Sequence, residues 1–259
     1  MSTQPIGIFD SGVGGTSIWK EINLLLPNEN TIYLADSKNA PYGLKSKSEI
    51  IDLSIKNTEY LLKKNCKIIV VACNTATTNA IKVLRENYQI PFIGIEPAIK
   101  PASLNTQTKA IGILATKGTL SSELFHKTTN LYSSGITIIE QVGNGLVELI
   151  ERGEIQSEAM KSLLKTYLQP MIEANIDYLV LGCTHYPYLM PLLLEILPKH
   201  VKIIDSGEAV ARQTKFILET KQLLNQIPIS TNYEFYNNAD TSVMKTLLNG
   251  DYTAEQLDF

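Results

Sequence analysis

Short apolar runs rich in β-branched residues alternate with helix-length segments along this chain of 259 residues. The apolar runs occupy residues 6–9, 31–35, 68–72, 92–95, 110–115, 136–142, 178–182 and 202–204. Amphipathic stretches at 16–25, 48–63, 75–86 and 157–174 lie between them. Strands that are separated by single helices form right-handed βαβ units, and helices cover both faces of the resulting parallel sheet. The alternation therefore predicts an α/β fold.

The charge balance argues against some classes of partner. The chain has 23 Lys and Arg against 26 Asp and Glu, a net charge of −3, whereas nucleic-acid binding needs a clustered basic surface. The arginines are only Arg85, Arg152 and Arg212. We therefore expect backbone N–H groups, hydroxyls and amides, rather than a guanidinium fork, to hold an anionic substrate.

The N-terminal residues and the cysteines indicate a compartment. The segment 1–5 leads into the first apolar run with no basic or apolar leader, and no apolar stretch reaches the roughly 18 residues of a membrane span. Cys66, Cys73 and Cys183 are too few and too far apart for a disulfide framework, and no metal-binding spacing joins them to the three histidines. We expect a soluble, cytoplasmic protein with free thiols and no metal.

The two halves of the chain echo each other. The run IGIF at 6–9 leads to DS and the run IGIL at 111–114 leads to AT, while VVACNT at 70–75 is matched by VLGCTH at 180–185. The spacing between the two matched segments is nearly the same in each half. Chance similarity of short apolar strands is the alternative, but we favour two similar α/β halves, each with a cysteine at a strand end.

Both of those cysteines lie where parallel sheets bind ligands, at the carboxyl end of a strand. Cys73 precedes a helix whose first N–H groups favour a thiolate or a carboxylate, although Asn74 and Thr75 are also ordinary helix caps. Cys183 is followed closely by His185, which can assist a reacting group. Cys66 is typical of a small buried apolar residue.

Two loops follow other strand ends. The segment DSGVGG at 10–15 lacks both the dinucleotide fingerprint and the phosphate-loop lysine, so its glycines indicate close backbone approach to a small anion. Asp10 either caps the following helix or exchanges protons beside Cys73. The segment PYG at 41–43 is typical of a turn, and its amides could also bind a carboxylate.

Taken together, these motifs resemble those of a known family. The matching segments are DSGVGG at 10–15, PYG at 41–43, ACNT at 72–75, EPA at 96–98 and GCTHYP at 182–187. They are similar to the motifs of glutamate racemases, cofactor-independent enzymes that supply D-glutamate for bacterial peptidoglycan. The resemblance implies two flavodoxin-like domains that face each other across an active-site cleft. Residues 1–97 with 211–259 would form the first domain and 98–210 the second, and a homodimer is an open expectation.

The resemblance also implies roles for single residues. Cys73 and Cys183 would exchange protons with opposite faces of the substrate α-carbon, assisted by Asp10 and His185. Glu148, in the LVE segment 146–148, would lie near the second cysteine; alternatively it belongs to an exposed acidic run with Glu151 and Glu154. Substrate contacts would come from Asp10, Ser11, Tyr42, Gly43, Asn74, Thr75, Thr116, Thr184 and His185. No cofactor or metal is implied.

Three rival functions make different predictions. An aspartate racemase or another two-cysteine epimerase would keep both thiols but change the side-chain pocket. A cysteine hydrolase would use Cys183 as nucleophile and His185 as base, and Cys73 would be dispensable. A binding module without catalysis would trap a small acid between its halves without exchange of the α-hydrogen.

Overall fold

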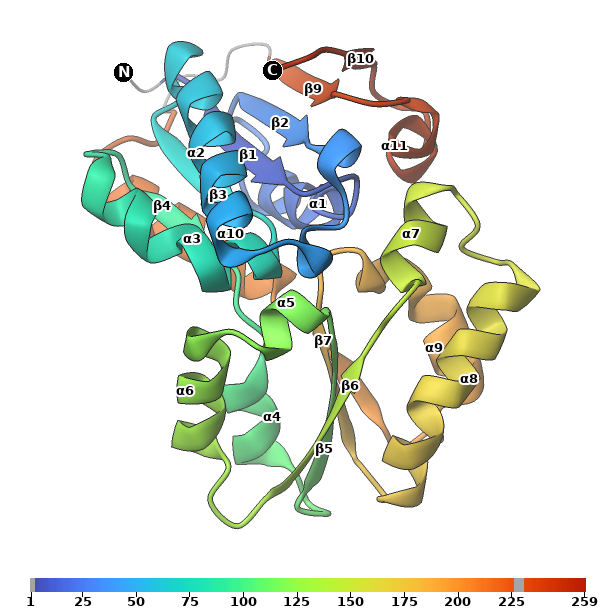
Figure 1. Cartoon of the computed structure of the whole chain (residues 1–259). Helices are drawn as coiled ribbons and strands as arrows, with labels where there is room; N and C mark the ends of the chain where they lie inside the picture. The colour runs from blue at the N-terminus through green and yellow to red at the C-terminus, as the bar shows by residue number, and fades with distance from the viewer. Residues whose placement is uncertain (1–2, 226–230) are drawn as a thin grey trace.

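The computed structural model describes residues 3–225 and 231–259, whose strands form two parallel sheets (Figure 1). The larger sheet has the order β10-β9-β2-β1-β3-β4 and the smaller one the order β6-β5-β7-β8. The strands of the larger sheet are β1 (Ile6–Asp10), β2 (Thr31–Ala35), β3 (Ile68–Val71), β4 (Phe92–Gly94), β9 (Tyr233–Asn237) and β10 (Ala254–Gln256). Those of the smaller sheet are β5 (Ala110–Ala115), β6 (Thr137–Val142), β7 (Tyr178–Gly182) and β8 (Lys202–Ile204). The predicted α/β fold is confirmed.

Helices cover both faces of the larger sheet because alternate strand residues are buried on opposite sides. Ile8 of β1 belongs to a buried cluster with Trp19, whereas Phe9 belongs to a second cluster with Leu61. The helices of this half are α1 (Thr16–Leu25), α2 (Lys47–Lys63), α3 (Asn74–Asn87), α10 (Gly207–Thr220) and α11 (Ser242–Leu247). The α1 and α10 helices pack on each other, so the chain returns to the first half after β8.

The smaller sheet is covered in the same way. Ile113 of β5 clusters with Phe125, and the next residue, Leu114, belongs to the cluster that contains Leu164 on the other face. The helices of this half are α4 (Ile99–Asn105), α5 (Lys117–Leu120), α6 (Glu123–Tyr132), α7 (Leu146–Glu151), α8 (Glu158–Glu173) and α9 (Met190–Ile196). Short 3₁₀ turns in the described residues are η1 (Ser37–Asn39), η2 (Tyr42–Leu44) and η3 (Tyr186–Leu189). No helix of the described residues is long and apolar enough to cross a membrane.

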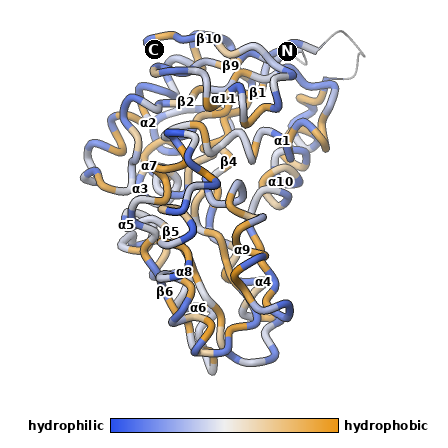
Figure 2. The backbone as a smooth tube through the Cα atoms, turned by 90° about the vertical axis from the view of Figure 1, so that its right-hand side faces the viewer, coloured by the Kyte–Doolittle hydropathy of each residue, from blue (hydrophilic) through white to orange (hydrophobic). Residues whose placement is uncertain are grey.

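The two halves lie one above the other in both views, with α5 and α7 between the sheets (Figures 1 and 2). The carboxyl ends of β1 and β3 point from the upper half toward those of β5 and β7 in the lower half (Figure 1). The loops that follow these strands therefore meet, and they carry the two cysteines that we singled out from the sequence.

Candidate active site

A small pocket, with a volume of about 10 Å³, lies where the strand ends of the two halves meet. Its lining residues are Ser11, Pro41, Tyr42, Gly43, Cys73, Asn74, Thr75, Thr116, Val147, Cys183, Thr184 and His185. The structure thus brings together ten of the twelve residues that the sequence indicated, and Asp10 and Glu148 are the two that do not line the pocket. Among the described lining residues there is no lysine or arginine.

Cys73 is the N-cap of α3, and its sulfur accepts a hydrogen bond from the backbone N–H of Ala76 at 3.4 Å. The Sγ atom also lies 3.6 Å from Oγ of Ser11. Burial raises the pKa of this thiol well above its usual value, and the nearby charge of Asp10 adds to the effect. The hydrogen bond at the helix start opposes this shift without overcoming it, so Cys73 holds its proton.

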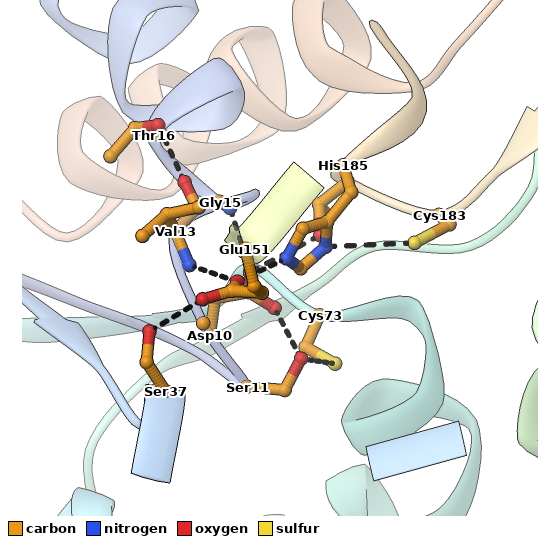
Figure 3. Close-up of polar contacts among 12 residues, drawn as sticks. Asp10, Ser11, Val13, Gly15, Thr16, Ser37, Cys73, Glu151, Cys183 and His185 are labelled. Atoms are coloured by element: carbon orange, nitrogen blue, oxygen red, sulfur yellow. Dashed lines mark hydrogen bonds and ion pairs between the residues drawn. The ribbon is translucent and has the colours of Figure 1, made fainter. Parts of the chain in front are cut away.

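Ser11 connects Cys73 to Asp10, as Figure 3 shows. The Ser11 hydroxyl donates to Oδ1 of Asp10 at 3.4 Å, while Oδ2 of Asp10 accepts from the backbone N–H of Gly15 at 2.7 Å. Asp10 is completely buried, and burial raises the pKa of its carboxyl although the charge of His185 opposes this. A carboxyl with a raised pKa that is linked to a thiol through one hydroxyl can take up and return a proton.

Cys183 has a different set of neighbours. Its Sγ lies 3.7 Å from Nδ1 of His185, and Nε2 of the same ring lies 2.6 Å from Oε1 of Glu151. Burial lowers the pKa of His185, but the hydrogen bonds to Cys183 and Glu151 outweigh it and raise the pKa well above its usual value. Burial raises the pKa of Glu151, yet the contacts with His185 and Ser37 leave it below its usual value. The imidazolium and the carboxylate therefore form a buried ion pair.

Glu151, and not Glu148, is the carboxylate beside the second cysteine. Glu148 lies one turn earlier on α7, lines a neighbouring hollow with Thr116, and makes no hydrogen bond to His185 or Cys183 within the described structure. The interpretation of Glu151 as part of an exposed acidic run is wrong, since its side chain is only 15% exposed. The sequence signal was weak because residues three apart share one helix face, so that either glutamate fits the pattern.

The glycine-rich loop makes room for the second half of the chain. A Cβ atom on Gly12 would collide with the carboxylate of Glu151, and one on Gly14 would collide with the ring of His185. Neither glycine has a left-handed backbone, so contact rather than conformation requires glycine here. The sequence suggested that the loop approaches a small anion; what the loop approaches in the structure is the ion pair of Glu151 and His185.

Further hydrogen bonds join the two halves around the pocket. The hydroxyls of Thr75 and Thr116 lie 2.8 Å apart, and Ser17 Oγ donates to the carbonyl of Thr184 at 2.9 Å. The carboxylate of Glu151 accepts from the backbone N–H of Val13 at 2.7 Å and from Ser37 Oγ at 2.8 Å. These bonds hold the halves closed over the pocket.

Asn74 is the one pocket residue whose polar side-chain atoms both lack partners in the described structure. Its Oδ1 and Nδ2 are buried without a hydrogen bond, and the residue is only 3% exposed. Buried polar atoms are almost always hydrogen-bonded, because leaving them unpaired costs about 1–3 kcal/mol. The side chain of Asn74 offers a donor and an acceptor, which suits a ligand that carries both kinds of group. No cluster of described His, Cys, Asp and Glu side chains fits a metal ion.

Comparisons with known proteins identify the family of this chain. The family model of Asp/Glu/hydantoin racemases matches residues 6–214. The glutamate racemase of Herpetosiphon aurantiacus is 45% identical over 240 residues, which are 93% of this chain and 94% of that protein. The glutamate racemase of Ralstonia pickettii is 49% identical over 208 residues, 80% of this chain and 74% of that protein.

Solved structures show the same likeness over the whole fold. A glutamate racemase of Bacillus anthracis superimposes with a TM-score of 0.89 at 30% identity, covering 100% of this chain and 98% of that one. The Escherichia coli glutamate racemase, in complex with L-glutamate and the activator UDP-MurNAc-ala, has a TM-score of 0.87 at 33% identity and covers 98% of each chain.

Proposed function

The chain belongs to the family of Asp/Glu/hydantoin racemases, and we propose that it interconverts L-glutamate and D-glutamate. The observation that carries this proposal is the pair of thiols in one pocket, Cys73 from the first half and Cys183 from the second. Inversion of a carbon by proton transfer needs a base on one face and an acid on the other, and two thiols from opposing halves meet this need.

We propose that each thiol works with its own relay. With D-glutamate, the Cys73 thiolate removes the α-proton and the Cys183 thiol delivers a proton to the opposite face; with L-glutamate the roles reverse. Asp10, through Ser11, receives the proton that Cys73 must lose before it can act as a base. His185, held by Glu151, exchanges protons with Cys183. The atoms balance, because one thiol gains the proton that the other gives up.

The pocket also offers neutral donors for the charge that develops when the α-proton leaves. Hydroxyls of Ser11, Thr75 and Thr184 and the free amide of Asn74 surround the space, and fixed donors in a closed site stabilise such charge strongly. Together with Tyr42, Gly43 and Thr116 they are the proposed substrate contacts. A closed pocket between two halves also excludes water and fixes the carbon between the sulfurs.

One observation favours a second candidate function, that of a cysteine hydrolase. Cys183, His185 and Glu151 are arranged in the order of a nucleophile, a base and an orienting acid. That function would not use Cys73 or its relay through Ser11 to Asp10. The relatives are also named as racemases. Cys73 is therefore the residue whose removal separates the two functions.

The wider role forms part of the same proposal. Supply of D-glutamate for peptidoglycan, in the cytoplasm, is supported by the motif resemblance and by relatives named glutamate racemase. A homodimer stays a prediction that light scattering of the purified protein can test.

The decisive test is proton NMR of each glutamate enantiomer in deuterium oxide, with enzyme free of metal and of pyridoxal phosphate. We expect the α-proton signal to disappear and the opposite enantiomer to form with wild type, and neither Cys73→Ala nor Cys183→Ala to do the same. Cys66→Ala is the matched control, because Cys66 is buried outside the pocket. Wild type that leaves both enantiomers untouched would contradict the proposal, and turnover by Cys73→Ala would contradict the two-thiol mechanism.

A further inference from the structure

The turn that follows β2 carries a completely buried carboxylate, Asp36. Its Oδ1 accepts hydrogen bonds from Nδ2 of Asn39 at 2.8 Å and from Nδ2 of Asn238 at 2.5 Å, and its Oδ2 accepts from the hydroxyl of Tyr42. Within the described part of the chain no lysine or arginine pairs with it. Neutral donors alone therefore compensate for its burial, and the loss of any one of them would destabilise this carboxylate.

Asn238 comes from a part of the chain far from the turn in sequence. It follows β9, which pairs with β2 so that Asn237 lies opposite Ala35. Besides its bond to Asp36, its Oδ1 accepts from the backbone N–H of Lys38 at 2.9 Å and its own N–H donates to the carbonyl of Ala35 at 3.2 Å. Three hydrogen bonds thus fix the turn at residues 35–38 to one residue that lies outside the match to the family model, which ends at 214.

Residues of the turn bind Tyr42, which lines the pocket, and Glu151, which pairs with His185. Tyr42, whose hydroxyl is held by Asp36, lines the pocket together with Gly43. Burial and then the charge of Asp36 raise the pKa of Tyr42 well above its usual value, so the phenol keeps the proton that it donates. In the middle of the turn, Ser37 donates to Glu151, the residue that pairs with His185.

We propose that Asn238 is a positioning residue of the racemase site. Its amide holds the 35–38 turn and the Asp36 carboxylate, and through them it places the Tyr42–Gly43 wall and the Ser37 contact to Glu151. The C-terminal segment, which supplies none of the pocket residues, then contributes to substrate binding. This inference rests on the proposed function, because its readout is the kinetics of glutamate racemisation.

The first experiment compares Asn238→Ala with Asn232→Ala. Asn232 lies just before the other end of β9, away from the turn. Among the described residues its side chain bonds to Glu234, and its backbone bonds to Asn30 and Thr31. We expect the KM for glutamate to rise about tenfold in Asn238→Ala, because displacement of Tyr42 and Gly43 weakens contacts with the bound substrate. The KM of Asn232→Ala should equal that of wild type.

Comparing the changes in KM and kcat distinguishes a loss of positioning from a loss of stability. A variant that is merely less stable has a smaller active fraction, which lowers the apparent kcat and leaves KM unchanged. Thermal melting of both variants identifies a temperature at which both are fully folded, and the kinetics are measured there. An unchanged KM in Asn238→Ala would overturn the inference, whereas an absence of racemisation by wild type would instead overturn the proposed function.

A double variant tests whether Asn238 acts through Asp36. Tyr42→Phe removes the donor to the other oxygen of the same carboxylate. If both side chains act by holding Asp36, the loss of kcat/KM in Asn238→Ala with Tyr42→Phe is smaller than the product of the two single losses. Losses that simply multiply would show that Asn238 acts independently of this network and would contradict the proposed path.

Discussion

The carboxylate of Glu151 and the imidazole of His185 form a buried pair, with 2.6 Å between Oε1 and Nε2. The same carboxylate accepts hydrogen bonds from Val13 and Ser37 in the other half of the chain. One side chain therefore links the charge on His185 to the contact between the two halves.

Replacement of Glu151 by Gln should reduce both activity and stability. The amide keeps an acceptor for Val13 but removes the charge that, together with the contact to Cys183, raises the pKa of His185, so we expect kcat to fall by about 10²-fold. Losing one partner of a buried pair should lower the free energy of unfolding by about 3 kcal/mol. Steady-state kinetics and urea unfolding measure the two effects. Unchanged values of both would contradict a role for the pair.

The stability difference between wild type and Glu151→Gln should depend on pH. His185 has a raised pKa, so its contribution is complete below its ordinary value of 6.5 and is lost as pH rises through the folded value. Glu151 has a lowered pKa, so its contribution is complete above its ordinary 4.5 and is lost as pH falls through the folded value. The stability difference should therefore be largest between pH 4.5 and pH 6.5. Urea unfolding at a series of pH values measures it, and a difference that does not change with pH would contradict the ion pair.

Glu148→Gln is the matched substitution one helical turn away. Since Glu148 touches neither His185 nor Cys183 in the described structure, we expect kcat to stay near that of wild type. A loss as large as that of Glu151→Gln, measured in the same assay, would restore Glu148 as the assisting carboxylate.

Asp10→Asn should make Cys73 easier to alkylate. Burial raises the pKa of Cys73 and the charge of Asp10 raises it further, so removing that charge moves thiolate formation to lower pH. Mass spectrometry of the ligand-free protein, treated with iodoacetamide over a pH series, measures the midpoint for each cysteine. Cys66 is the internal control, because burial raises its pKa to about 12 and it should stay unmodified at neutral pH. A midpoint for Cys73 that does not fall would contradict the electrostatic coupling.

Gly14→Ala and Gly135→Ala should differ in their effect on kcat. A methyl group on Gly14 displaces the ring of His185 and disturbs its pair with Glu151, so we expect about a 10²-fold loss of kcat together with a loss of stability. Gly135 has a φ of +70° and no atom within 4 Å of the place that a methyl group would take, so alanine there should cost about 1 kcal/mol of stability and leave kcat unchanged. Equal kinetics in the two variants would show that the loop does not position His185.

Asn74→Leu should stabilise the protein measured without glutamate and abolish its function. Leucine has a similar shape and removes two buried polar atoms that have no partner in the described structure, which should raise the free energy of unfolding by about 1–2 kcal/mol. Thermal melting with and without glutamate measures both effects, because wild type should gain stability from the ligand and the variant should not. A less stable variant would show that the amide is satisfied in the free protein.

Much of the fold could be predicted because strands buried on both faces leave continuous apolar runs. All eight predicted strands are present, and four of them match at both ends, such as Thr31–Ala35 and Tyr178–Gly182. The strands that we missed lie at one end of the larger sheet, with β10 at its edge and β9 between β10 and β2. Both are partly exposed, and polar residues such as Glu234 and Asn237 interrupt the apolar pattern of β9. Such strands carry no continuous apolar signal, and nothing local to residue 233 indicates that it pairs with β2.

The limits of sequence reasoning at the site have a different cause. Cys73 and Cys183 could each be placed at the carboxyl edge of a sheet, because parallel strands end at a common edge. That the edges of the two sheets face each other was an expectation from the family resemblance. Glu151 could not be placed, since its position depends on how the two halves meet, and Asn238 lies on an element that the sequence did not reveal. The raised pKa of Cys73 was also missed, because burial outweighs the effect of the helix start and burial is a property of the closed fold.

The two thiols are chemically unlike, because Cys73 caps an α-helix and Cys183 adjoins a histidine. A racemase acts on mirror-image molecules, so its overall equilibrium constant is one and kcat/KM must be equal in both directions. The unequal surroundings of the two sulfurs can therefore make kcat differ between the enantiomers only if KM differs by the same factor. A substitution that makes kcat for one enantiomer larger than kcat for the other must therefore make the KM for that enantiomer larger by the same factor.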